Sequence, residues 1–105
     1  MKSGHIKPAE VQDMLANRSD FTLLDVRSRE EHLAAHIPGS ELLPLDQLAT
    51  GAERVLPGKD KTVVVYCQSG GRSAQAARIL TQLGYTDVRD LGGIMGWPFQ
   101  VARGR

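Results

Sequence analysis

The chain lacks several features that would place it in a membrane or outside the cell. It has one cysteine among 105 residues, so an internal disulfide is impossible. No stretch approaches the roughly 18 consecutive apolar residues that a membrane-spanning helix needs. The start, from Met1 to His5, lacks the apolar centre of a secretory signal peptide. We therefore expect a reducing, cytoplasmic location and no association with a membrane.

A strong charge of either sign is also missing. Thirteen basic and twelve acidic side chains leave a net charge of +1 with histidine neutral. Because nucleic-acid-binding domains are usually far more basic, we expect no nucleic-acid partner. The hydrophobic share of 41% and the charged share of 24% indicate a folded globular protein rather than a disordered one. At this length the sequence predicts a single domain over residues 1–105 with one sizeable core.

The first half of the chain contains short segments of different periodicity. Pro8 suits the first position of a helix, and Val11, Met14 and Leu15 recur at helical spacing. The apolar run 21–26 follows a polar turn and predicts a buried strand. The pattern then predicts a short helix over 28–33, a short strand over 40–43, helical turns over 45–49 and a loop over 51–61.

The second half contains the strongest strand signal. Residues 62–66 are rich in β-branched side chains on both faces, which is typical of a parallel-sheet strand covered on both sides. An amphipathic helix is predicted over 73–83, with Gly84 as its C-terminal stop, and a last strand over 87–91. This alternation predicts an α/β fold with a mostly parallel central sheet of about five strands flanked by helices. Its functional site should lie at the carboxyl ends of the strands.

Segment 67–73 joins the strongest strand to the amphipathic helix and carries the lone cysteine. Cys67 stands at the strand end, and two glycines, Gly70 and Gly71, precede Arg72. Such a loop directs backbone N–H groups and the positive end of a helix at one point. These donors and the Arg72 cation favour thiolate over thiol, as nucleophilic cysteine chemistry requires.

A buried cysteine beside an ordinary strand–helix turn is the simpler alternative. We favour the nucleophile because the strand end, the glycines and the arginine coincide. The loop lacks the spaced glycines and lysine of a phosphate-binding P-loop, so we expect no nucleotide.

Four segments of the sequence, in this order, show a family pattern. They are Asp25-Val26-Arg27 with Glu31, His36-Ile37-Pro38-Gly39 with Leu43-Pro44-Leu45, Cys67-Gln68-Ser69-Gly70-Gly71-Arg72-Ser73, and Leu91-Gly92-Gly93 with Trp97. Together they resemble the single-domain rhodaneses, a sulfurtransferase family, over nearly the whole chain. The resemblance implies a three-layer rhodanese-like fold. His32, Ala35 and Ser40 stand where that family usually has an aromatic residue, glycine and alanine.

The resemblance offers two chemistries that differ in loop length. Sulfurtransferases of this fold have four residues between cysteine and arginine, whereas phosphatases and arsenate reductases have five. Four residues separate Cys67 from Arg72. The spacing therefore favours sulfur transfer, and a phosphatase or arsenate reductase is the weaker alternative.

By resemblance, the protein is a thiosulfate sulfurtransferase. Cys67 would take a sulfane sulfur from thiosulfate or a similar donor, become a persulfide, and pass the sulfur to cyanide or a thiol without metal or organic cofactor. The residues expected to bind the substrate are Gln68, Ser69, Gly70, Gly71, Arg72 and Ser73. A sulfur carrier that does not turn over, or a partner-binding module delivering sulfur to another protein, is the alternative. The oligomeric state is not indicated.

Several other charged residues have two interpretations. Arg72 either binds the anionic donor, which we favour because cations are unusual at the positive end of a helix, or pairs with an acid. The resemblance implies a structural ion pair between Arg27 and Glu31, and a structural role for Asp25. His5, His32 and His36 share no metal-ligand spacing, so we expect no metal.

Overall fold

The strand predicted over 62–66 is the middle strand of a five-stranded sheet in the computed structural model, which describes residues 2–104. The strand order is β1-β5-β4-β2-β3, and all neighbouring strands are parallel. The strands are β1 (Lys2–His5), β2 (Phe21–Asp25), β3 (Glu41–Leu42), β4 (Thr62–Cys67) and β5 (Asp87–Gly93).

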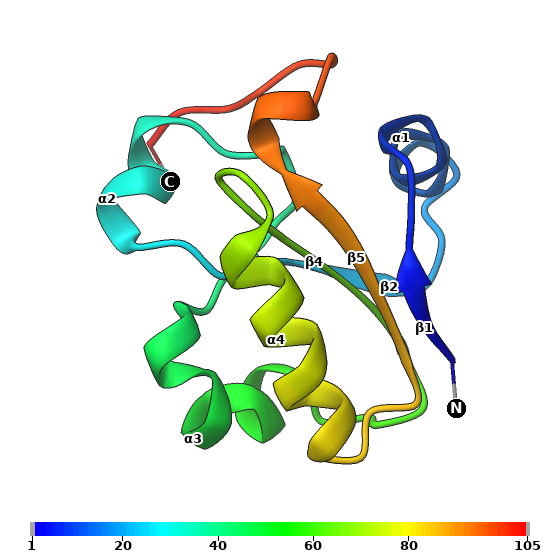
Figure 1. Ribbon diagram of the computed structural model, residues 1–105. Helices are drawn as coiled ribbons and strands as arrows, with labels where there is room; N and C mark the ends of the chain where they lie inside the picture. The colour runs from blue at the N-terminus through cyan, green and yellow to red at the C-terminus, as the bar shows by residue number, and fades with distance from the viewer. Residues whose placement is uncertain (1, 105) are drawn as a thin grey trace.

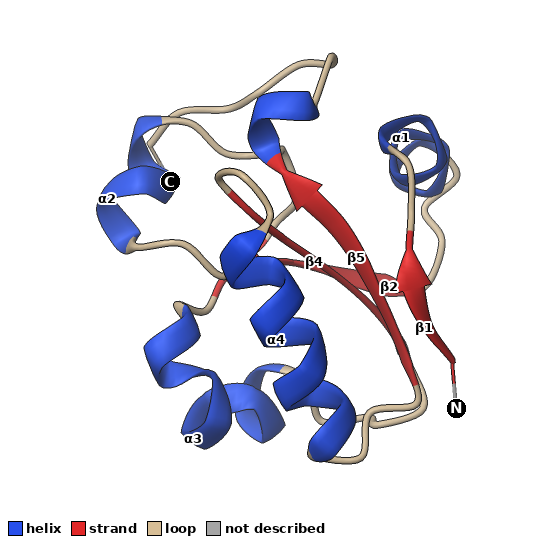
Figure 2. Ribbon diagram, viewed as in Figure 1, coloured by secondary structure: helices blue, strands red, loops and turns tan. Residues whose placement is uncertain are grey.

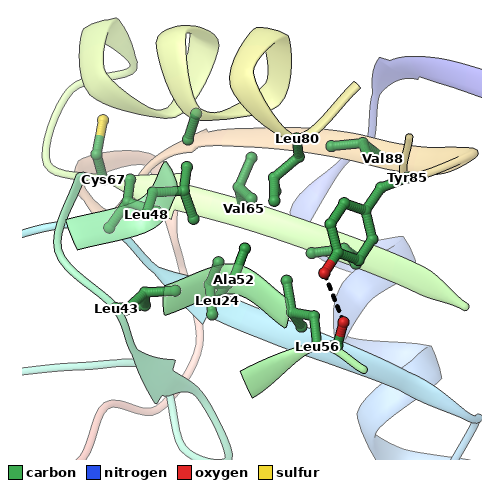
Figure 3. Close-up of a cluster of buried hydrophobic side chains, with 13 residues drawn as sticks. Leu24, Leu43, Leu48, Ala52, Leu56, Val65, Cys67, Leu80, Tyr85 and Val88 are labelled. Carbon is green, nitrogen blue, oxygen red and sulfur yellow. Dashed lines mark hydrogen bonds between the residues drawn. The ribbon is translucent and has the colours of Figure 1, made fainter. Parts of the chain in front are cut away.

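Helices cover both faces of this sheet (Figures 1 and 2). On one face Val63 and Val65 of β4 pack with α3 (Leu45–Val55) and α4 (Gly71–Gln82), as Figure 3 shows for Leu48, Leu80 and their neighbours. On the other face Val64 and Tyr66 pack with α1 (Pro8–Ala16). Successive residues of a strand point to opposite faces, so the central strand is buried twice. The three-layer α/β prediction is confirmed.

Two short helices lie at the carboxyl edge of the sheet. They are α2 (Arg29–Ala34), which follows β2, and the 3-10 helix η1 (Ile94–Gly96), which follows β5. The C-terminal segment returns to α2, where His36 and Ala102 exchange backbone hydrogen bonds of 2.9 and 2.8 Å. Figure 1 shows both helices at the same end of the sheet as the β4–α4 loop.

The prediction of a loop over 51–61 is wrong for its first five residues, because α3 continues to Val55. Gly51 suggested a helix end. In the structure it is buried, and a Cβ there would lie 3.1 Å from a methyl group of Leu43. The glycine allows α3 to lie close to the sheet, and this tertiary packing outweighs its low helix propensity.

Strand β1 was not predicted. Lys2 to His5 pairs in parallel with Asp87 to Asp90 of β5, at the edge of the sheet. This segment carries no apolar alternation, so only its pairing with a strand more than eighty residues away defines it. Among residues 2–104, no helix is long and apolar enough to span a bilayer.

Candidate active site

The loop between β4 and α4 places its backbone around the sulfur atom of Cys67. Cys67 ends β4 and is 1% exposed. Gly70 has φ +111°, a left-handed conformation that favours glycine, and its N–H donates to Sγ of Cys67 at 3.0 Å. Because α4 begins at the next residue, the sulfur lies at the positive end of that helix. The predicted arrangement of loop N–H groups around the sulfur, called the cradle below, is present.

Burial and the hydrogen bonds of this cradle shift the pKa of Cys67 in opposite directions. Burial raises the pKa of the thiol, but hydrogen bonds from the N–H and hydroxyl of Ser73 and from the N–H groups of Gly70 and Ser69 outweigh it. The net pKa lies below the ordinary value of 9.0. Each donor stabilises the thiolate more than the thiol, so the loop itself provides activation that elsewhere needs a base.

The remaining loop residues predicted to bind the substrate face elsewhere in the unliganded structure. Gln68 accepts a hydrogen bond from Nη1 of Arg27 through its Oε1 at 3.2 Å. Gly71 opens α4. Arg72 holds Glu31 of α2 with two hydrogen bonds, of 2.7 and 2.8 Å. The sulfur is therefore surrounded by backbone and Ser73, with the longer side chains tied to neighbouring elements.

The ion pair of Arg72 corrects the expected partner of Arg27 and shows which of the two interpretations of Arg72 the structure has. Arg27 does not pair with Glu31, as the resemblance implied, but with Asp25, at 2.8 Å. Glu31 instead holds Arg72, so the structure shows the ion-pair interpretation of that arginine. Hydrogen bonds from Arg72, the largest cause, and from the N–H and hydroxyl of Ser28 lower the pKa of Glu31 from 4.5 to about 2, against an opposing effect of burial. No local pattern predicts this ion pair, since 41 residues separate Glu31 from Arg72.

A buried polar network lies behind the loop. Asp25 is fully buried and accepts hydrogen bonds from Arg27, from Nδ1 of His32 at 2.8 Å and from the hydroxyl of Tyr66 at 3.0 Å. Burial would raise the pKa of Asp25, but the hydrogen bonds from Arg27 and His32 outweigh it and lower the pKa below 3.8. Since Arg27 also holds Gln68, this network connects β2 to the first residue after Cys67.

Two of the residues that depart from the family pattern contribute side chains to this network. His32 contacts Asp25 and stacks on His36, with ring centroids 3.9 Å apart. Ser40 lies 2.9 Å from the hydroxyl of Tyr66. They reach the loop through Asp25 and Arg27.

The end of β5 closes the loop from behind, a role that sequence reasoning did not assign. A Cβ on Gly93 would stand 2.3 Å from the carbonyl oxygen of Gln68, so only glycine fits there. The N–H of Met95 donates to the same oxygen at 3.4 Å. The Leu91-Gly92-Gly93 motif was the available signal, because paired glycines mark a close approach of backbones.

A groove of about 360 Å³ opens at this edge of the sheet. Its walls include Val26, Arg27, Ser28, Leu45, Asp46 and Arg72. Within residues 2–104, no group of three or more histidine, cysteine or acidic side chains is arranged to hold a metal ion.

The model of the rhodanese-like domain matches residues 7–98. The chain belongs to the rhodanese family. It is 38% identical over 71 residues to thiosulfate sulfurtransferase PspE of Escherichia coli, covering 68% of each chain. The solved structure of a human single-domain sulfurtransferase superposes with a TM-score of 0.79 at 31% identity, covering 89% of this chain and 93% of that one.

A further relative is much longer. The chain is 35% identical over 101 residues to a probable adenylyltransferase/sulfurtransferase, MoeZ, of Mycobacterium tuberculosis. The alignment covers 95% of this chain but 26% of that protein, so the rhodanese chain spans about a quarter of its relative's length. Rhodanese domains of this sequence type thus occur both alone and within larger proteins.

Proposed function

We propose that this rhodanese transfers sulfane sulfur through a persulfide on Cys67. The observation that carries the proposal is the cradle, in which a nearly buried sulfur accepts the Gly70 N–H at 3.0 Å and has a lowered pKa. The names of its relatives, sulfurtransferases in both sequence and structure comparisons, support the same reaction class.

In the first step the Cys67 thiolate attacks the outer sulfur of thiosulfate. A bond forms between Sγ and that sulfur, the sulfur–sulfur bond of the donor breaks, and sulfite leaves with the electron pair. The loop N–H groups then hold the terminal sulfur of the persulfide as an anion. Cyanide or a thiolate attacks this sulfur in the second step and restores the Cys67 thiolate.

The surroundings of the loop favour a narrow, anionic donor. Cys67 is 1% exposed, which leaves little room for a bulky leaving group at Sγ. The adjoining groove carries Arg27 and Arg72, and we propose that the donor enters along it. Arg72 would then attract the negative charge of the donor while it remains paired with Glu31.

Incubation with thiosulfate tests this function. The intact chain should gain the mass of one sulfur, dithiothreitol should remove it, and steady-state turnover with thiosulfate and cyanide should be measurable. Cys67→Ser should fold and lose all of these, because a hydroxyl forms no persulfide. Substantial turnover by that variant, or hydrolysis of aryl phosphates through Cys67 without sulfur uptake, would overturn the proposal.

A sulfur-carrier role is the second candidate. It is favoured by the long mycobacterial relative, in which a matching segment is part of a larger protein. A dedicated carrier would take up sulfur on Cys67 and turn over poorly with small acceptors. Comparing the rate of persulfide formation with steady-state turnover separates the two roles.

A further inference from the structure

A second groove, of about 430 Å³, lies along α4 beside the edge strand β1. Its volume is within the range of small-molecule sites. Ala74 and Ala77 of α4 form one wall, and Gly4 of β1, which has no side chain, opens the other. Figure 1 shows α4 running along β5, with β1 beyond it at the edge of the sheet.

Asp90 of β5 lines this groove and, within residues 2–104, has one carboxylate oxygen that accepts no hydrogen bond. It is 8% exposed, and on β5 it points to the same face as Val88, which packs under α4. One carboxylate oxygen, Oδ1, accepts the Gly92 N–H at 2.8 Å. Among residues 2–104, no donor reaches the other oxygen. No fully buried side-chain oxygen of the described residues lacks a partner, so this oxygen is open to the groove, where the donor group of a ligand can reach it.

Two further polar side chains line the groove. His5 is the direct register partner of Asp90 on β1, and Arg78 projects from α4. Neither side chain makes a hydrogen bond or ion pair with any residue in the described range 2–104, and Arg78 therefore does not pair with Asp90. A buried acceptor and a free cation therefore line one groove, which suits a ligand carrying both charges.

We propose that this groove binds a small zwitterion, with an ammonium group on Asp90 and a carboxylate on Arg78. The ammonium supplies the donor that Asp90 lacks, and the guanidinium offers two parallel donors to a carboxylate. The alanine and glycine walls leave room for a short aliphatic chain between the two charges. Amino acids and short peptides are the ligand class. Cys67 does not line this groove, so the proposal is independent of the proposed sulfur transfer.

Backbone amide shifts of the isotope-labelled protein test this site. The probes are glycine, 4-aminobutanoate and 6-aminohexanoate, which differ in charge separation, with butylamine and butanoate each carrying one charge. At least one zwitterion should shift the amides of Gly4, His5, Ala77 and Thr81 saturably. It should bind about tenfold more tightly than either single-charge probe, as a charged hydrogen bond requires.

Two variants identify the contacts. Asp90→Asn keeps an oxygen for the Gly92 N–H and should reduce zwitterion affinity about tenfold without unfolding the chain. Arg78→Gln, on an exposed helix position, should reduce it similarly, whereas Arg54→Gln on α3 serves as the matched control and should not. Equal binding of butanoate and the zwitterions, unchanged affinity in Asp90→Asn, or no saturable shift with any probe would each overturn the proposal.

Discussion

At Cys67, burial and hydrogen bonding act on one sulfur atom in opposite directions. Burial is the largest single effect and favours the neutral thiol, yet four donors from three residues together favour the thiolate. Ser73 has two of them. Its hydroxyl has a single proton, which in the structure is directed to the Gly70 carbonyl at 3.0 Å. Ionisation of Cys67 would draw this proton toward the sulfur, so we expect the hydroxyl to act mainly in the thiolate state.

Alkylation by iodoacetamide as a function of pH tests this balance. Because the pKa of Cys67 is lowered, the midpoint of the rate profile should lie below 9.0. Ser73→Ala removes the hydroxyl while keeping the N–H, so its midpoint should rise toward the ordinary value. Ser69→Ala is the matched control, since Ser69 hydrogen-bonds to the sulfur through its backbone N–H, which the substitution keeps. A wild-type midpoint at or above 9.0 would show that burial dominates.

At the level of elements, the position of the loop depends on the end of β5. Gly93→Ala should therefore displace the loop, because its methyl group would meet the Gln68 carbonyl, which is backbone and cannot rotate away. We expect a loss of about 1–3 kcal/mol in the free energy of unfolding, the usual cost of overpacking, and a marked fall in sulfur transfer. Gly96→Ala, three residues beyond the end of β5 in η1, is the control, because a Cβ there meets nothing within 4 Å.

Urea unfolding and persulfide formation measure the two effects separately. If Gly93→Ala matches Gly96→Ala in both stability and activity, the close approach is not required to hold the loop.

Loop length is the second property of this region. Inserting one glycine after Gly70 would widen the cradle and move the Gly70 and Ser73 donors away from the sulfur. Sulfur transfer should fall at least about tenfold, since small displacements in an active site are costly. The same insertion after Gly58, in the turn that precedes β4, is the control for chain length. Wild-type rates of sulfur uptake in the Gly70 insertion would contradict the role of the spacing.

The elements that sequence predicted well are those with a local signal. β4 is β-branched on both faces, and Gly84, at φ +100°, follows α4 as expected. β1 was missed because its partner strand lies far along the chain, and the end of α3 was missed because Gly51 packs closely against Leu43 instead of ending the helix. The same limit applies to the site. The Cys67 loop is local and was predicted, whereas the partner of Arg72 depends on how α2 meets α4. The partner of Arg27 is local, two residues away, but the expected pair with Glu31 obscured it.

Over the whole molecule, charged and polar side chains, some buried and some partly exposed, connect the central sheet to α2 and α2 to α4. Asp25 on β2 contacts Tyr66 on β4 and His32 on α2, and Glu31 connects α2 to α4. Burial raises the pKa of Tyr66 to about 12, with Asp25 adding to the effect, so its hydroxyl stays a donor. All these contacts lie at the carboxyl edge, and their loss should loosen the edge that holds the loop.

The free energy of unfolding should accordingly depend on pH in the acid range. The pKa values of Asp25 and Glu31 are lowered by folding, Glu31 from 4.5 to about 2. In acid the unfolded chain therefore binds more protons than the folded one, and stability rises with pH. The contribution is complete above the unfolded values, near pH 5, and should be lost progressively as the pH falls from there toward 2. Urea unfolding at several pH values should show a plateau at neutral pH and a decline over this window.

Glu31→Gln separates the ion pair between α2 and α4 from the rest of this decline. At pH 7 the variant should be about 1 kcal/mol less stable, an upper value for a partly exposed pair. The deficit should shrink as the pH approaches 2, because wild-type Glu31 then becomes protonated and loses the same charge. Glu30→Gln, which removes a neighbouring charge of α2 that forms no ion pair among residues 2–104, is the control. A deficit that stays constant from pH 7 to pH 2.5 would mean that Glu31 acts through packing or capping of α2, and that its charge does not hold the two helices together.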